Sequence, residues 1–322
     1  MMTRLTLALG AALFAAVPSA SAAAQDWPSH PVKIIVGFAP GSSADQLARL
    51  VAEGLTASLN QRFIVEYRQG NSGSIAASFT ARAISDGYTL MIGGSGPHIT
   101  IPTLHPDIGY DPMKDFTHIA MIAGDSYVLA ANPTLGVRDL AGLIKLAKTR
   151  SAPLTSSSPG PGSLGQMLLE EFKRKAGIEI THVPAPDSGL MEVLGNHINM
   201  TLTVPLTAGE QIRAGKVVGL AMSSQARSPA YPTIATFTEQ GFPEITGATW
   251  FWLTGPKNLP PEVAEKLNRE VRRSLQLPKA RAYFAQQALL SKDLDLAGTT
   301  AFVGNELAHW SALAKRVGMT AQ

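Results

Sequence analysis

The first part of the chain alternates between short apolar runs and longer stretches in which apolar residues recur every three or four positions. The runs have the length of strands and the periodic stretches that of helices: strands at 33–39, 62–68 and 88–94, helices at 43–60 and 75–84. In the first helix, Leu47, Val51 and Leu55 share one face. A β-α-β-α-β order predicts a parallel sheet whose strands end at a common ligand-binding edge.

A second series of the same kind begins near residue 125. Its pattern predicts a helix at 137–148, a strand at 154–158, a helix at 166–177 and strands at 178–184, 198–204 and 217–224. Helical stripes without strands of their own follow residue 261, and we expect them to pack on the first unit. The predicted fold class is α/β, with two lobes that are each a mostly parallel sheet flanked by helices.

The chain crosses between the two units at two places, near residues 125 and 248. We therefore expect a discontinuous first lobe, residues 25–125 plus 249–322, and a second lobe, residues 126–248. The aromatic run Trp250-Phe251-Trp252 lies at the second crossing, where we expect it to form core between the lobes.

The N-terminus has the features of a secretory signal peptide. A short basic stretch precedes an apolar run at 5–17, and small residues follow up to Ala24. We expect residues 1–24 to be removed on export and the mature protein to be periplasmic. No later segment has the length of apolar sequence that a membrane-spanning helix needs.

The composition excludes several kinds of function. The formal net charge is +3 with no long run of one sign, which argues against nucleic-acid binding. The chain has no cysteine, so thiol chemistry and cysteine-based metal sites are excluded. Its seven histidines show no close metal-ligand spacing. We expect no metal and no cofactor.

Two loops rich in glycine and serine each connect a predicted strand to a predicted helix. The first, residues 38–43, would place backbone N–H groups at the N-terminus of the next helix, a suitable place for an anion. The second contains Gly160, Gly162 and Gly165 in the spacing of a dinucleotide fingerprint, but the acid required at the end of the next strand is missing. A nucleotide site is therefore disfavoured, and a small-anion loop or a capping loop without ligand remain.

Several blocks along the chain, in one order, resemble a known family. They are WPSHPVKIIVGFAPGSSAD, SDGYTLMIG, YDPMKDFTHIAMIA, AGKVVGLAMSSQARSPAYPTIATFTEQGFPEI and WFWLTGP. They make the chain similar to the Bug-type receptors, the extracytoplasmic solute-binding components of tripartite tricarboxylate transporters. This resemblance, which runs from Trp27 to Val317, implies a type II periplasmic-binding-protein fold, or Venus flytrap. It implies a non-enzymatic receptor, which we expect to be a monomer, that delivers a small organic acid to the membrane components of its transporter.

The same resemblance implies which residues bind the ligand. The loop after the first strand would grip a carboxylate, and loops of the second lobe would close over it. The residues are Phe38, Ala39, Gly41, Ser42, Ser43, Asp45, Gly94, Ser95 and His98 in the first lobe, and Ser157, Gly162, Ser163, Ala185, Asp187 and Thr203 in the second.

The second lobe departs from the family pattern at two places. Ala185-Pro186-Asp187 stands where family members usually have Tyr-Lys-Gly, and residues 199–203 lack two acids that are common there. A dianion would meet Asp187 instead of a lysine, and an unpaired buried charge is costly. We therefore expect a ligand with one carboxylate and one neutral or donor-bearing end.

Two functions remain as alternatives to a transport receptor. The sequence PGSLG resembles the nucleophile elbow GxSxG, with Pro161 in place of the first glycine, so Ser163 could serve an exported serine hydrolase. Its base would be His182, His197 or His309. A position at the N-terminus of a helix explains Ser163 more simply. The other alternative is a ligand sensor that signals without transport.

Overall fold

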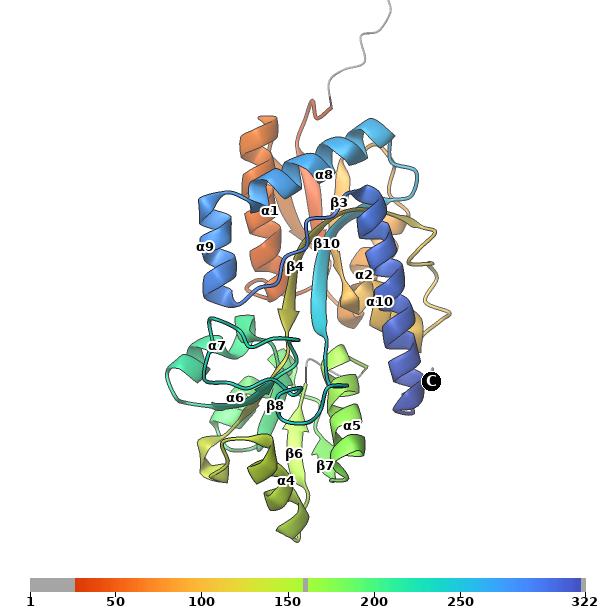
Figure 1. The fold of residues 1–322 in the computed structure, drawn as a ribbon. Helices are drawn as coiled ribbons and strands as arrows, with labels where there is room; N and C mark the ends of the chain where they lie inside the picture. The colour runs from red at the N-terminus through yellow and green to blue at the C-terminus, as the bar shows by residue number, and fades with distance from the viewer. Residues whose placement is uncertain (1–26, 159–161, 320–322) are drawn as a thin grey trace, which may run out of the picture.

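The computed structural model describes residues 27–158 and 162–319, which form two lobes arranged end to end (Figure 1). In this described part, each lobe is built on one five-stranded sheet, with strand orders β2-β1-β3-β10-β4 and β7-β6-β8-β5-β9. The first sheet contains β1 (Val32–Val36), β2 (Phe63–Tyr67), β3 (Thr89–Gly94), β4 (Phe116–Ser126) and β10 (Ala248–Pro256). The second contains β5 (Val128–Ala131), β6 (Leu154–Ser157), β7 (Ile180–His182), β8 (Met200–Thr203) and β9 (Val218–Met222).

Helices cover both sheets, which confirms the predicted two-lobed α/β fold. Those around the first sheet are α1 (Ser43–Leu59), α2 (Ser74–Ala81), α3 (Ile101–Leu104), α8 (Pro261–Leu275), α9 (Pro278–Gln287) and α10 (Leu296–Arg316). Those around the second are α4 (Leu140–Thr149), α5 (Leu164–Ala176), α6 (Leu190–Leu194) and α7 (Pro205–Arg213). No helix in the described ranges combines the length and the apolar content needed to cross a bilayer.

Strand direction shows how the chain passes between the lobes. In the first sheet β1 is parallel to β2 and β3, whereas β10 is antiparallel to both of its neighbours, β3 and β4. In the second sheet β6 is parallel to β7 and β8, and β5 is antiparallel to β8 and β9. Each sheet is therefore mixed: the strand that arrives from the other lobe runs against four strands of common direction. The chain crosses the gap between the sheets at two places: where β4 continues into β5, and where β10 begins.

The helix that follows the first strand forms where the sequence predicts it. Leu47, Val51 and Leu55 are fully buried against the first sheet, at the spacing of one helical face. Ser42 is the N-cap residue, and Asn60 ends the helix in the left-handed conformation with φ 52°. The helix is thus fixed at both ends, with its N-terminus facing the other lobe.

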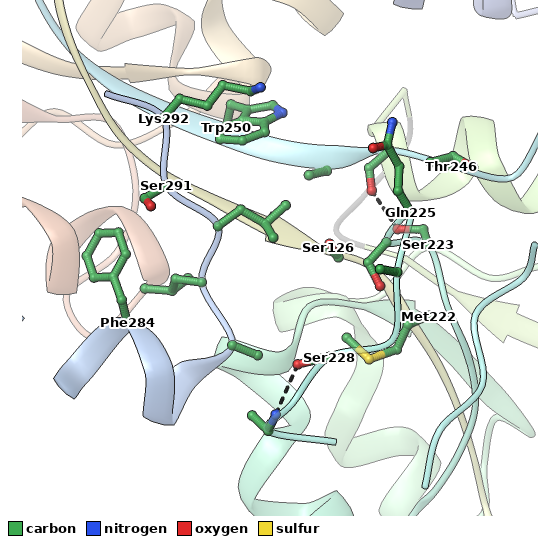
Figure 2. A pocket seen from close by; sticks show the side chains of 18 of the residues that line it. Ser126, Met222, Ser223, Gln225, Ser228, Thr246, Trp250, Phe284, Ser291 and Lys292 are labelled. Atoms are coloured by element: carbon green, nitrogen blue, oxygen red, sulfur yellow. Dashed lines mark hydrogen bonds between the residues drawn. The ribbon is translucent and has the colours of Figure 1, made fainter. Parts of the chain in front are cut away.

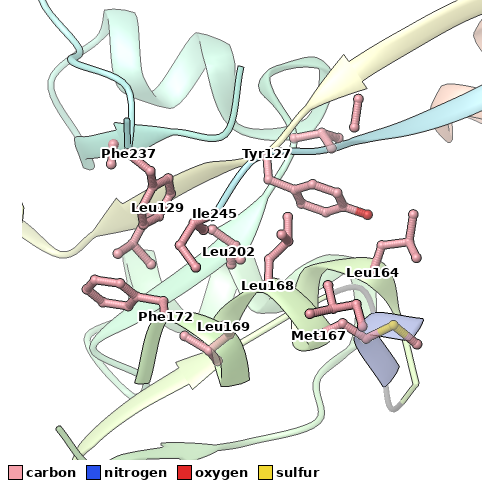
Figure 3. Packing of buried hydrophobic residues seen from close by; sticks show 14 of the residues in the cluster. Tyr127, Leu129, Leu164, Met167, Leu168, Leu169, Phe172, Leu202, Phe237 and Ile245 are labelled. Atoms are coloured by element: carbon pink, nitrogen blue, oxygen red, sulfur yellow. The ribbon is translucent and has the colours of Figure 1, made fainter. Parts of the chain in front are cut away.

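The core of the second lobe is organised around α5 (Figure 3). The ring of Phe172 lies edge-on to the rings of Phe237 and Phe242, with centroid distances of 5.5 and 5.1 Å. Leu168 and Leu164 continue the same buried face toward the helix N-terminus. Each such fully buried side chain contributes roughly 1.5–3 kcal/mol, so this face holds the start of α5 firmly in place.

The aromatic run at the second crossing is part of strand β10. Trp252 is fully buried in the first lobe, where its Nε1–H donates to Nδ1 of His118 over 3.0 Å. Trp250 points to the same face as Trp252 and packs edge-on against Phe302 of α10, whereas Phe251 between them points to the other face. Because strand residues alternate between faces, the run supplies core to both sides of the crossing.

The C-terminal helix α10 packs on the first lobe, as the sequence predicts, and also reaches the second lobe. It begins against β4 and runs beside β10 toward α5 of the second lobe (Figure 1). Near its end, Arg316 donates from Nε to Oε1 of Glu171 on α5 over 3.2 Å, and Trp310 packs close to Gly247. Sequence periodicity shows which face of a helix is apolar, but not how far the helix extends beyond its own lobe.

Candidate ligand-binding cleft

A cavity of about 570 Å³ lies between the two lobes, within the range of small-molecule sites. We call it the cleft. Loops from the first lobe, loops from the second lobe and both crossing segments line it. Its predicted residues are Phe38, Ala39, Gly41, Ser42, Ser43, Gly94, Ser95 and Ser163, and its other polar residues include Gln46, Ser72, Thr100, Tyr127, Ser188, Thr207 and Thr249.

The loop between β1 and α1 presents the N-terminus of α1 to the cleft. Gly41 adopts a φ of +84°, a left-handed conformation that favours glycine and turns the chain into the helix. The N–H of Gly41 is already used, because it donates to Oδ2 of Asp45 over 2.7 Å. Ser43 and Ala44 occupy the first turn of the helix, where backbone N–H groups have no partner within the helix. These two amides are the donors available to an anion.

Asp45 holds this loop in shape and does not line the cleft, contrary to the role expected for it. Its carboxylate accepts from Gly41, from Nε of Arg49 over 3.0 Å and from the hydroxyl of Tyr67 over 2.8 Å. Burial alone would raise the pKa of Asp45, but the hydrogen bonds from Gly41, Tyr67 and Arg49 together lower it. The residue is therefore a charged, saturated acceptor beneath the loop.

The second lobe presents the N-terminus of α5 from the other side of the cleft. Ser163 is its N-cap, and its hydroxyl accepts from the N–H of Gln166 over 3.2 Å. The hydroxyl of Ser163 also lies 3.1 Å from that of Ser158, and it is Ser158 whose hydroxyl contacts Nε2 of His182 over 2.9 Å. Ser163 thus caps a helix, and another serine stands between it and the imidazole that a hydrolase would need as its base.

The crossing segments supply polar groups that sequence reasoning missed. Tyr127 and Thr249 line the cleft from the first and the second crossing, respectively. Burial raises the pKa of Tyr127, and hydrogen bonds to Thr249 and Gly165 partly offset that effect, so its phenol stays protonated. Ser95 accepts from the N–H of Trp250 over 2.9 Å, which ties the third loop of the first lobe to β10.

The charge of the cleft is carried by helix ends and not by side chains. None of the described residues that line it is Lys, Arg, Asp or Glu. Its polar groups are hydroxyls, amides and the N-terminal turns of α1 and α5, which carry a partial positive charge. The arrangement favours an anion without placing a full opposite charge beside it.

Several predicted site residues lie elsewhere. His98 is fully buried in the first lobe, with its ring 4.6 Å from that of Phe116 and 5.4 Å from that of Trp252. Burial, and then the neighbouring His118, lower its pKa well below the usual range, so it is a neutral core residue. The reason is packing from β4 and β10, which its loop position in the sequence does not reveal.

In the second lobe, several residues that were expected to contact the ligand lie outside the cleft. Ser157 and Thr203 are fully buried and do not line the cleft. Ser157 donates to the carbonyl of Ser188 over 2.6 Å and so positions a residue that does line it. Gly162 contacts Leu104 of the first lobe. Ala185 is half-buried outside the cleft, and the side chain of Asp187 lies outside the described part of the structure.

The described ranges contain no cluster of three or more His, Cys, Asp or Glu side chains suited to a metal ion.

A family model described as the tripartite tricarboxylate transporter family receptor matches residues 47–319. The chain belongs to this family. The family consists of periplasmic solute-binding receptors, so the resemblance to Bug-type receptors is confirmed, and with it the assignment of this chain as a solute-binding receptor.

Individual relatives agree with the family assignment. Protein BugT of Bordetella pertussis is 31% identical over 320 residues, 98% of this chain and 98% of its own length. A solved structure from R. palustris with adipate is 31% identical, covers 92% of this receptor and 100% of its own chain, and superposes with a TM-score of 0.86. The periplasmic binding protein BugD is 25% identical, covers 92% and 100% of the two chains, and superposes with a TM-score of 0.83.

Proposed function

We propose that this receptor binds a small aliphatic dicarboxylate in the cleft and delivers it to the membrane components of a tripartite transporter. One observation carries the proposal: the N-termini of α1 and α5, from different lobes, open into a single cavity of about 570 Å³ lined by neutral donors. One carboxylate would accept from the amides of Ser43 and Ala44. The other would accept from Ser163 and the amide of Leu164.

The dicarboxylate replaces the monoanion expected from the sequence. That expectation rested on Asp187, whereas the described lining residues of the second lobe carry no acid. The adipate held by the R. palustris relative supports the same ligand class. Export through the signal peptide that the sequence predicts at residues 1–24 would bring the receptor to the compartment in which it meets such a solute.

The proposal includes binding without turnover. The contact between Ser163 and Ser158, and the cap that Ser163 forms on α5, support a binding role for its hydroxyl. Wild-type protein is expected to leave p-nitrophenyl esters unhydrolysed. Ester hydrolysis that the Ser163→Ala variant abolishes would establish the hydrolase alternative instead.

Calorimetric titration with adipate, adipate monomethyl ester and hexanoate tests the ligand class. Adipate is expected to bind at least about tenfold more tightly than either monoanion, since a carboxylate at the second helix end gains hydrogen bonds worth about 1.5–3 kcal/mol. Equal binding of the monoester would favour the monoanion. Binding of none of the three would refute the carboxylate class.

One substitution isolates the backbone donors. Ser43 is the first residue of α1, and Ser42 before it has an extended backbone with ψ 164°, so Ser43→Pro removes one N–H without disturbing the helix. The chain already has proline at the first position of α7, α8 and α9. Ser43→Pro is expected to weaken adipate binding about tenfold. Leu296→Pro, at the same position of α10 and outside the cleft, is the matched control and should leave binding unchanged.

Delivery to a transporter is tested in cells. Deletion of the gene should abolish uptake of labelled adipate, and restored expression should recover it. Intact uptake in the deletion strain, together with binding in vitro, would favour the sensor alternative.

A further inference from the structure

A second cavity, of about 850 Å³, lies behind the crossing strands (Figure 2). Along β10, Thr249 and Phe251 line the cleft, whereas Ala248 and Trp250 line this second cavity. Because side chains alternate between the two faces of a strand, the two cavities lie on opposite sides of the same crossing. We call the second one the rear cavity.

Both lobes form walls of the rear cavity. The first lobe contributes Phe284 of α9, residues 288–292 and Phe302 of α10. The second lobe contributes residues 222–230 and Thr246, which face them across the cavity in Figure 2. An occupant of this space therefore contacts both lobes at once.

The wall around Trp250 combines aromatic rings with a cation. Trp250 and Phe302 lie edge to face, with their ring centroids 5.0 Å apart. Nζ of Lys292 lies 5.5 Å from the centroid of Trp250 and 5.2 Å from that of Phe302. In the described ranges Lys292 forms no salt bridge, although it is near enough to Glu306 to lower the pKa of that carboxyl, and the residue is exposed. A flat ring with an anionic group fits this combination of contacts.

Two serines in the rear cavity have unused hydrogen-bonding groups. Ser126, at the first crossing, is only 2% exposed, and its hydroxyl has no hydrogen-bond partner in the described ranges. The hydroxyl of Ser224, from the second lobe, is likewise buried and unpaired. Both residues line the cavity. Buried polar groups are almost always paired, so two unpaired hydroxyls in one cavity point to a polar partner that enters it.

Among the other ionisable groups that line the cavity, Arg227 and Glu306 have hydrogen-bond partners of their own. Arg227 is paired with Glu239, with 3.1 Å between Nη2 and Oε1. Glu306 accepts from Nε1 of Trp310 over 2.9 Å; burial raises the pKa of Glu306, and this hydrogen bond, His309 and Lys292 partly offset the rise. His309 lies at the same end of the cavity.

We propose that the rear cavity is a second binding site, for a small aromatic carboxylate whose ring packs on Trp250 and Phe302 and whose carboxylate pairs with Lys292. The hydroxyls of Ser126 and Ser224 bind a further polar substituent of the ligand. This site goes beyond the proposed cleft function and does not depend on it.

Occupancy of the rear cavity favours the closed cleft. Gly162 of the second lobe lies against Leu104 of the first, so the lobes are in contact next to the cleft residue Ser163 in the described conformation. Rotation about the crossing strands that opens the cleft moves the rear walls together. A ligand in the rear cavity opposes that motion and strengthens binding in the cleft, and the coupling is reciprocal. This coupling, unlike the site itself, rests on the proposed function.

Binding of 2-naphthoate, followed by calorimetry and by quenching of tryptophan fluorescence, tests the site. Ala285 is exposed on α9 and lines the rear cavity, so Ala285→Trp places an indole in part of it, and Ala282→Trp on the same helix is the matched control outside it. Ala285→Trp and Lys292→Gln are each expected to weaken 2-naphthoate about tenfold. Ala282→Trp, the distant Lys148→Gln and the cleft variant Ser43→Pro should leave it unchanged. The neutral 2-naphthamide should bind about tenfold more weakly than 2-naphthoate.

Two sets of outcomes decide the proposal. Absence of binding, or binding that Ala285→Trp and Lys292→Gln leave intact, overturns the rear site. Saturating 2-naphthoate is expected to lower the Kd of adipate at least about threefold, a coupling within the usual range. An unchanged or raised Kd overturns the coupling. Failure of adipate to bind at all is a failure of the cleft proposal, and it is separate because 2-naphthoate binding is measured without adipate.

Discussion

Replacement of Asp45 by asparagine is expected to destabilise the receptor by removing the acceptor beneath the loop between β1 and α1. The carboxylate accepts from the backbone of Gly41, from Tyr67 and from Arg49. Asparagine keeps one acceptor oxygen but turns an NH₂ group toward at least one of these donors. The loop that carries Ser43 then loses its tether.

The expected size of the effect follows from the exposure of each partner. Arg49 has a side chain that is 62% exposed, so its ion pair with Asp45 contributes at most about 1 kcal/mol. A hydrogen bond from a partly buried neutral donor to a charged acceptor is worth about 1.5–3 kcal/mol, and one such bond is lost. The free energy of unfolding should therefore fall by about 2–3 kcal/mol at neutral pH. Adipate affinity should fall about tenfold as Ser43 and Ala44 lose their fixed orientation.

The pH dependence separates the charge from the shape of the side chain. The pKa of Asp45 is lowered in the folded protein, so its contribution is fully present above the unfolded-state pKa of about 3.9 and is lost as pH falls through the folded value. The difference between wild type and Asp45→Asn should shrink below about pH 4.

Urea unfolding of both proteins from pH 7 to acid measures this difference, and NMR titration of the carboxyl carbon of Asp45 reads its protonation directly. Asp107→Asn, at an exposed acid, is the control and should change stability by less than about 0.5 kcal/mol. A penalty that stays constant down to the lowest pH at which both proteins fold would show that the charge of Asp45 is irrelevant. A penalty below about 0.5 kcal/mol at pH 7 would show that water replaces its contacts.

Three further outcomes are expected. Gly41→Val should weaken adipate binding severely, because the φ of +84° at Gly41 strains any β-branched residue, although no atom lies within 4 Å of a Cβ placed there. Gly41→Asn and Ser42→Ala should bind adipate almost normally, and binding by Gly41→Val equal to that of the wild type would contradict this prediction. Burial lowers the pKa of His118 to about 4, so between about pH 6.5 and 4 the unfolded chain binds a proton that the folded protein does not. The free energy of unfolding should therefore fall by about 1.4 kcal/mol for each pH unit of acidification in this window, and His118→Gln should flatten that slope in urea titrations. Small-angle scattering should show a smaller radius of gyration with adipate than without it, and no change at saturation would argue for a rigid receptor.

Local sequence patterns were sufficient for the elements that position the cleft. The spacing of Leu47, Val51 and Leu55 predicts α1. The predicted order of strands and helices then places the loop after β1 at the carboxyl edge of the sheet, where the structure has it. The limits of the two lobes, at residues 125 and 248, stay a prediction.

Residues whose roles depend on distant neighbours could not be placed in this way. His98 follows a strand, as ligand-binding residues often do, but Phe116 and Trp252 from other strands enclose it. Tyr127 and Thr249 line the cleft only because two chain crossings meet there. Their one signal in the sequence is position: each lies within two residues of a predicted crossing.

The lack of formal charge among the described lining residues of the cleft bears on how cargo leaves the receptor. A ligand held by an arginine would remain ion-paired to one lobe after the lobes part, and release would wait for that pair to break. Here the polar lining residues come from both lobes, so opening withdraws the donors of one lobe and water takes their place. In the proposed transport role, unloading would then be governed by the rate of opening, and moderate changes in salt should alter the residence time of the ligand only slightly.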